Sequence, residues 1–384
     1  MIANSPVAHA YDAGGPLGVV SADTLIGGGA LGPGVAFSRA SSGRALGADG
    51  ATLQAVAADM PRFHGTARRL LVEGQRQNLL LWSQDLAQAS WAVSNGAAKS
   101  ATALAAPDGT GSGATIAFGS LSRSQMSQSL GLASGTYTAS VWAREAGGRP
   151  FRFKAYTPDM GDAYSPDLAT TPEWRRYSFT FAVPSAQAGN VAVANRGAGG
   201  VGSVEVWGVQ LEQGAFASSY VPTTGAAATR APDLASYPLS SAQAQAGTLV
   251  GTFLLPAFAP LSQGLLLLDD GTAANRLILS RSSAASAVRI ASVAGGVAGP
   301  AADAGPVSAG VPFRAALTWD GSGASAAVAG GAPVSVAAGP AGLSRLLMGY
   351  AGANLAEPMF GEVGPLTLYP VRLPDAQLQA LTSN

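Results

Sequence analysis

Residues 136–144 (TYTASVWAR) and 174–183 (WRRYSFTFAV) decide the fold. In both segments apolar and polar residues alternate, which is the pattern of a β-strand with one buried face. The predicted inward positions are Tyr137, Ala139, Val141 and Ala143 in the first segment, and Tyr177, Phe179, Phe181 and Val183 in the second. The outward face of the first segment then carries Trp142 and Arg144. Each segment is therefore predicted to be a strand that covers a hydrophobic core.

Strand-like segments continue along the rest of the chain, for example at residues 151–156, 204–211, 248–255 and 313–321. The 50 glycines and 24 prolines lie between such segments and show no three-residue period, so a collagen-like structure is excluded. Short strands separated by turn residues, with almost no helical periodicity, predict an all-β protein. We expect two jelly-roll-type antiparallel β-sandwiches.

The length of 384 residues predicts two or three domains. Residues 1–72 contain only short apolar stretches, so we expect an extended N-terminal arm that docks on another protein. Residues 73–222 form the first predicted sandwich and residues 248–384 the second. Residues 223–247, rich in Pro, Ala and Thr, are the predicted linker.

Charge and composition exclude several classes of protein. The 22 acidic and 22 basic residues balance, and no basic stripe of the kind that binds nucleic acid is present. The absence of cysteine excludes disulfides. The first residues lack the apolar core of a secretory signal, and no apolar run reaches the ~18 residues that span a bilayer. We therefore expect neither nucleic-acid binding nor membrane insertion.

Two longer phrases carry a family resemblance: residues 70–82 (LLVEGQRQNLLLW) and residues 207–221 (WGVQLEQGAFASSYV). Together with residues 37–43 (FSRASSG) and 61–63 (PRF), they resemble the head-spike or fibre proteins of tailed phages and gene transfer agents. In those proteins the two phrases open and close a sandwich that resembles carbohydrate-binding modules. Residues 248–384 are similar to laminin-G-like, concanavalin-type lectin sandwiches.

The resemblance implies a non-enzymatic adhesin on the surface of a virion or phage-like particle. Its expected partners are a host capsular polysaccharide or lipopolysaccharide and, through residues 1–72, the capsid or other virion proteins. A homo-oligomer, made in the bacterial cytoplasm and released by lysis, is also implied. The alternative is a structural capsid decoration or spike-base protein that binds virion proteins without recognising a glycan.

A glycan site needs aromatic side chains for the sugar face beside polar groups for the hydroxyls. The candidate glycan-binding residues are Trp142, Arg144, Arg152, Lys154, Tyr156, Trp174 and Arg176. If a turn at residues 145–151 places Arg144 opposite Arg152, the first five form one patch. A shift of one residue would instead turn Trp142 into the core. Both possibilities remain open from the sequence.

The chain offers little for metal binding or catalysis. Asp159, Asp162 and Asp167 lie in one loop and could hold a structural calcium ion, although a solvated turn has the same composition. Related modules frequently carry an aspartate ligand for calcium where this chain has Gly208. The two histidines, His9 and His64, are far apart in sequence from any nucleophile motif. We therefore expect no enzymatic activity and no cofactor beyond that calcium.

Overall fold

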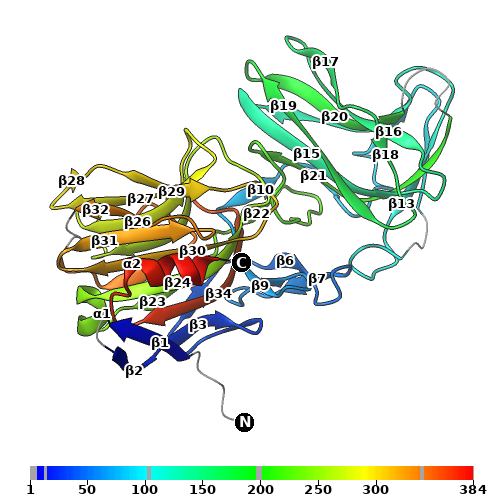
Figure 1. The fold of residues 1–384 in the computed structure, drawn as a ribbon. Coiled ribbons are helices and arrows are strands. Elements are labelled where there is room, and N and C mark those ends of the chain that lie inside the picture. Colours follow the sequence, from blue (N-terminus) through cyan, green and yellow to red (C-terminus); the bar gives the residue numbers. More distant parts are fainter. Residues whose placement is uncertain (1–6, 13–14, 102–104, 196–200, 338–340, 384) are drawn as a thin grey trace.

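The computed structural model describes residues 7–12, 15–101, 105–195, 201–337 and 341–383. About half of the chain is β-strand, every strand pairing among the described residues is antiparallel, and the strands form two β-sandwiches (Figure 1). The prediction of two antiparallel sandwiches is therefore confirmed. The helices are α1 (Ser241–Gln245) and α2 (Asp375–Thr382).

The first sandwich consists of a five-stranded and a six-stranded sheet. The five-stranded sheet has the order β12 (Ala98–Ala101), β13 (Ala114–Phe118), β21 (Gly202–Gln213), β15 (Gly135–Arg144) and β19 (Arg175–Val183). The six-stranded sheet has the order β11 (Ala92–Ser94), β14 (Gln125–Leu132), β20 (Gln187–Asn195), β16 (Pro150–Thr157) and β17 (Gly161–Tyr164), with β18 (Leu168–Ala169) also paired to β16. The alternating residues Tyr137, Val141 and Phe181 contribute to the core between the sheets, as the sequence predicts.

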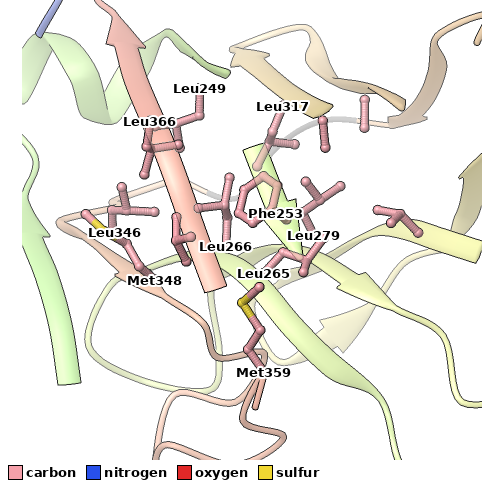
Figure 2. Close-up of a cluster of buried hydrophobic side chains, with 14 of the residues drawn as sticks. Leu249, Phe253, Leu265, Leu266, Leu279, Leu317, Leu346, Met348, Met359 and Leu366 are labelled. Atoms are coloured by element: carbon pink, nitrogen blue, oxygen red, sulfur yellow. The ribbon is translucent and has the colours of Figure 1, made fainter. Parts of the chain in front are cut away.

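The second sandwich also has two sheets. One contains β28 (Val297–Ala298), β27 (Ala287–Ala294), β26 (Arg276–Arg281), β25 (Gln263–Asp269), β33 (Arg345–Met348), β23 (Leu234–Pro238), β5 (Ala36–Ser38) and β29 (Ala302–Pro306). The other contains β32 (Val334–Ala337), β31 (Gly323–Val328), β30 (Phe313–Asp320), β24 (Gly247–Leu254), β34 (Gly361–Tyr369), β3 (Asp23–Gly27), β4 (Ala30–Leu31), β9 (Arg69–Val72) and β8 (Phe63–His64). Figure 2 shows leucine, methionine and phenylalanine side chains from both sheets, such as Leu266 and Leu366, in the core between them.

The expected N-terminal arm is wrong for residues 23–72, because β3, β4, β5, β8 and β9 belong to the second sandwich and the separate hairpin at residues 43–56 packs against the first. β3 and β9 pair with β34, and β5 pairs with β23. Leu25 and Val72 are fully buried in the core that Figure 2 illustrates. These short strands do not need a core of their own, since they complete a core whose other strands follow residue 230. The first sandwich is thus inserted into the chain of the second.

Part of the predicted linker also belongs to this sandwich. Within residues 223–247, β22 (Ala228–Arg230) pairs with β10 (Arg76–Asn78), while β23 lies between β33 and β5. Ala235 in β23 is fully buried. The remaining short pairs are β1 (Val7–Asp12) with β2 (Gly15–Ser21) and β6 (Gly43–Leu46) with β7 (Leu53–Val56).

The two phrases that carry the family resemblance meet where the sandwiches join. The Asn78 side-chain amide donates hydrogen bonds to the backbone carbonyls of Val209 (3.3 Å) and Val221 (2.9 Å). The hydroxyls of Ser83 and Tyr220 are hydrogen-bonded at 2.7 Å, and both residues are buried. The phrases therefore form one connected structure at the base of the first sandwich.

A buried cluster of ionic side chains lies beside this joint. Its members are Arg39, Arg62, Glu73, Arg230 and Asp233, all nearly inaccessible to solvent. Arg62 pairs with Glu73 at 2.9 Å and Arg39 pairs with Asp233 at 3.1 Å.

The Glu73 carboxylate also connects the two sandwiches, because it accepts a hydrogen bond from the backbone N–H of Ser219 at 2.8 Å. Burial alone would raise the pKa of Glu73, but the charges of Arg230 and Arg62 and the Ser219 hydrogen bonds bring it well below the ordinary value. Glu73 is therefore ionised throughout the usual pH range.

Candidate functional site

The structure separates the five residues that were predicted to form one glycan-binding patch. β15 belongs to the five-stranded sheet and β16 to the six-stranded sheet, so the loop between them crosses from one sheet to the other. The pairing of Arg144 with Arg152, on which a single patch depended, therefore does not occur. Arg144 lies opposite Glu205 on β21, and Arg152 lies opposite Ala194 on β20.

Arg152, Lys154 and Tyr156 lie on the outer face of the six-stranded sheet. Arg152 is paired with Asp167, and the Lys154 ammonium lies 3.0 Å from an Asp162 carboxylate oxygen. The same ammonium lies 5.6 Å from the centre of the Tyr156 ring. Lys154 is only 6% exposed, so ion pairing within the protein already occupies most of its polar surface.

The three aspartates of the predicted calcium loop do not converge on one point. Asp162 pairs with Lys154 and with Arg123, the latter at 3.0 Å, while Asp159 accepts a hydrogen bond from Ser185. Among the described residues, no group of three or more His, Cys, Asp or Glu side chains is arranged to hold a metal ion. The loop residues therefore do not fit a calcium shell.

A cleft of about 900 Å³ lies between the β6–β7 hairpin and the outer face of the five-stranded sheet. It contains the other four predicted residues, Trp142, Arg144, Trp174 and Arg176. The opposite wall is formed by hairpin residues and their neighbours, among them Arg44, Leu46, Thr52, Leu53 and His64. Figure 1 shows β6 and β7 between the two sandwiches, next to the first.

Trp142 lines this cleft and is buried on the outer face of the five-stranded sheet. Only 8% of it is exposed, because Trp207 and Tyr220 pack edge-on against it with ring centres 5.4 Å away. The Arg176 guanidinium lies 4.5 Å from the centre of the Trp142 ring. Of the two possibilities left open by the sequence, the structure favours the buried tryptophan, although the side chain faces away from the central core.

Trp174 is the half-buried aromatic side chain of the cleft wall. Its indole N–H donates a 2.8 Å hydrogen bond to the Ala105 carbonyl, which fixes the ring orientation. The Arg144 guanidinium lies 4.9 Å from the Trp174 ring and forms an ion pair with Glu205. The arrangement presents an oriented aromatic ring beside a charged group with several hydrogen-bond donors.

Arg176 lines the cleft and is held by hydrogen bonds within the protein. It donates hydrogen bonds to the Ser218 carbonyl at 2.6 Å and to the Ser140 hydroxyl at 2.9 Å. Burial lowers the pKa of the Arg176 guanidinium, and the nearby charge of Glu212 opposes that shift. Since both terminal nitrogens of its guanidinium donate within the protein, Arg176 positions Trp142 more than it offers itself to a ligand.

Sequence reasoning missed the hairpin side of the cleft. Leu53 donates a backbone hydrogen bond of 2.7 Å to Pro107 and packs in a cluster with Trp142 and Trp207, which holds the hairpin against the first sandwich. His64 is also part of this wall, and burial lowers its pKa below 6.5 while the charge of Glu362 opposes that shift. A single sequence gives no sign that residues about a hundred positions apart meet.

A second hollow of about 420 Å³ shares Arg144 and Pro172 with the cleft. Its other lining residues include Thr115, Glu145, Arg149, Ser203 and Glu205. The cleft therefore continues past Arg144 along the edge of the five-stranded sheet. An elongated ligand could contact both hollows.

No protein-family model and no curated protein matches the chain. Solved structures with some similarity include the CBM40 module of a Ruminococcus gnavus sialidase bound to α2,6-sialyllactose, with a TM-score of 0.30, 20% identity, and 36% of this chain and 84% of that chain covered. The tandem CBM22 modules of Paenibacillus barcinonensis Xyn10C have a TM-score of 0.30 and 9% identity, with 77% and 98% covered.

A Trypanosoma rangeli sialidase in complex with 2,3-difluorosialic acid has a TM-score of 0.31 and 19% identity, with 39% of this chain and only 26% of the sialidase covered. Similarity at this level decides neither the fold nor the ligand of this chain. The resemblance to head-spike and fibre proteins stays a prediction. None of the helices in the described part of the chain has the length and apolar character needed to cross a membrane.

Proposed function

We propose that the protein is a non-enzymatic glycan-binding protein whose binding site is the cleft beside Trp174. The observation that carries the proposal is the half-buried Trp174 ring, oriented by its hydrogen bond to Ala105 and placed beside Arg144 in a cleft of about 900 Å³. Aromatic rings pack on the apolar faces of sugars, and neighbouring polar groups fix the hydroxyls. The cleft volume lies in the range of small-molecule sites.

We further propose that the protein acts on the surface of a virion or phage-like particle, where it attaches to a host capsular polysaccharide or lipopolysaccharide. The resemblance of residues 70–82 and 207–221 to head-spike and fibre proteins supports this role. Individual sugar sites bind weakly, so attachment would depend on many copies acting together on one particle. A homo-oligomer, held to other virion proteins, fits that requirement.

The test is binding of the purified protein to capsulated cells and to isogenic cells without capsule. We expect binding to the capsulated cells alone. Trp174→Ala should weaken it about tenfold, because a buried aromatic contact contributes roughly 1–2 kcal/mol. The matched control is Tyr156→Ala, which removes a half-exposed aromatic ring on the other sheet of the same sandwich and should leave binding unchanged.

Equal and negligible binding to both strains would contradict glycan recognition. It would favour the alternative, a structural capsid decoration or spike-base protein whose sandwiches bind other virion proteins. If Tyr156→Ala weakens binding and Trp174→Ala does not, the glycan site lies on the six-stranded sheet instead of in the cleft.

A further inference from the structure

The cleft beside Trp174 has an excess of cationic side chains. Its arginines are Arg44, Arg144, Arg175 and Arg176. Glu173 is the one acidic residue among the described lining residues. Glu205 neutralises Arg144 from the adjoining hollow, and Glu212 lies near the buried Arg176. Each of these two arginines therefore has a carboxylate near it within the protein.

Arg44 is not balanced in this way. Its side chain is partly buried, yet it makes no hydrogen bond, ion pair or ring contact with any described residue. Its backbone is firmly placed, since it pairs with Ala55 across the hairpin and its carbonyl accepts a 3.1 Å hydrogen bond from Arg62. Partial burial of a cation without a partner is unfavourable, and an anion in the cleft would offset that cost.

Arg44 and Trp174 belong to opposite walls of the cleft, one in the β6–β7 hairpin and the other in the first sandwich. A guanidinium group binds carboxylates and phosphates through two parallel hydrogen bonds. We infer that the cleft binds an anionic saccharide whose ring packs on Trp174 and whose carboxylate or phosphate pairs with Arg44. The inference rests on the proposed function and specifies its ligand class.

The experiment uses an array of oligosaccharides in neutral, carboxylated and phosphorylated forms, probed with the full-length protein. We expect binding to carboxylated or phosphorylated sugars, and the two arms distinguish which anion is recognised. Arg44→Gln should weaken this binding about tenfold or more, the effect of losing a charged hydrogen-bonding partner. Arg276→Gln is the matched control, because Arg276 is also partly buried, forms no ion pair with any described residue and lies outside the cleft.

Arg44→Lys separates a folding defect from a binding defect. Lysine keeps the charge but lacks the paired donors, so this variant should retain part of the affinity that Arg44→Gln loses. Binding should also weaken as salt concentration rises. Equal loss in Arg44→Lys and Arg44→Gln, with unchanged unfolding midpoints, still supports the inference through the paired donors.

Three results would overturn the inference. The first is binding to neutral sugars that is lost in Trp174→Ala and unchanged in Arg44→Gln. That result would contradict an anionic ligand and would leave the proposed function standing. Binding to capsulated cells without binding to any charged sugar on the array would do the same. Failure to bind both the array and capsulated cells would overturn the inference together with the proposed function.

Discussion

At the scale of single residues, the sequence predicted some side chains of the cleft but not their surroundings. Trp174 and Arg176 are both in the cleft because outward positions on a strand follow from alternation alone. Trp142 is on the same face, yet it is buried, since the hairpin and residues near Tyr220 cover it. Alternation states which side of a sheet a residue takes, and it says nothing about what covers that side.

His64 is predicted to make the protein less stable below neutral pH. Its Nδ1 accepts a 3.3 Å hydrogen bond from the Leu46 N–H, which requires the unprotonated imidazole, and burial lowers its pKa below 6.5. The folded state therefore binds fewer protons than the unfolded state. The contribution of unprotonated His64 to the free energy of unfolding is complete above pH 6.5. It is lost as the pH falls through the pKa of His64 in the folded state.

The measurement for His64 is the thermal unfolding midpoint between pH 7.5 and 4.5, compared with that of His64→Gln. Glutamine can accept the Leu46 hydrogen bond but does not titrate, and the carboxylates titrate in both proteins. We expect the wild-type midpoint to fall relative to the variant as the pH decreases. A constant difference across this range would contradict the prediction.

At the scale of elements, the long strands were predictable and the short ones were not. β15 and β19 have ten and nine residues, enough for alternation to be visible. β5 and β9 have three and four residues, and their partners β23 and β34 lie far along the chain. A segment too short to show a period can be assigned to a sheet only through its partner, which a single sequence does not reveal.

Gly208 marks an irregular position in β21. Ser140 pairs with Gln210 and Trp142 with Trp207, so β21 has one more residue than β15 between these pairs. Gly208 takes a left-handed φ of 65°, and a Cβ there would lie 3.1 Å from Trp142. This bulge favours glycine, because any side chain at this position would be strained and crowded.

Gly208→Ala should lower the stability of the first sandwich by about 2–3 kcal/mol, the sum of left-handed strain and crowding against Trp142. Gly161→Ala is the matched control: its φ is 69° and a Cβ would meet no atom within 4 Å. The free energy of unfolding of the control should fall only by the cost of the backbone strain, roughly 1–2 kcal/mol. Both are measured by urea unfolding followed by tryptophan fluorescence, and equal losses would show that crowding contributes nothing.

At the scale of the whole molecule, the buried ionic cluster is the main polar contact at the joint. Three arginines share two carboxylates there, so each carboxylate is needed. Asp233→Asn should destabilise the protein by about 3–5 kcal/mol, because it leaves buried positive charge without a partner. Asp303→Asn, which breaks the exposed pair with Arg289, should cost less than about 1 kcal/mol.

Thermal and urea unfolding of these two variants test the role of the cluster. Similar midpoints for Asp233→Asn and Asp303→Asn would mean that the joint does not depend on the buried charges.

The family resemblance drew attention to the neighbouring phrases at residues 70–82 and 207–221. Their packing at the joint could not be predicted, since it depends on the insertion of one sandwich into the other.

The insertion has a mechanical consequence. The chain leaves the second sandwich through β10 and returns through β22, and these two strands lie side by side with Arg76 opposite Arg230. A force that pulls the sandwiches apart is therefore divided between two backbone segments and stretches both in the same direction. Neither strand slides past the other, so the hydrogen bonds between them are not sheared. A load on the first sandwich would thus reach the second sandwich through two backbone segments at once.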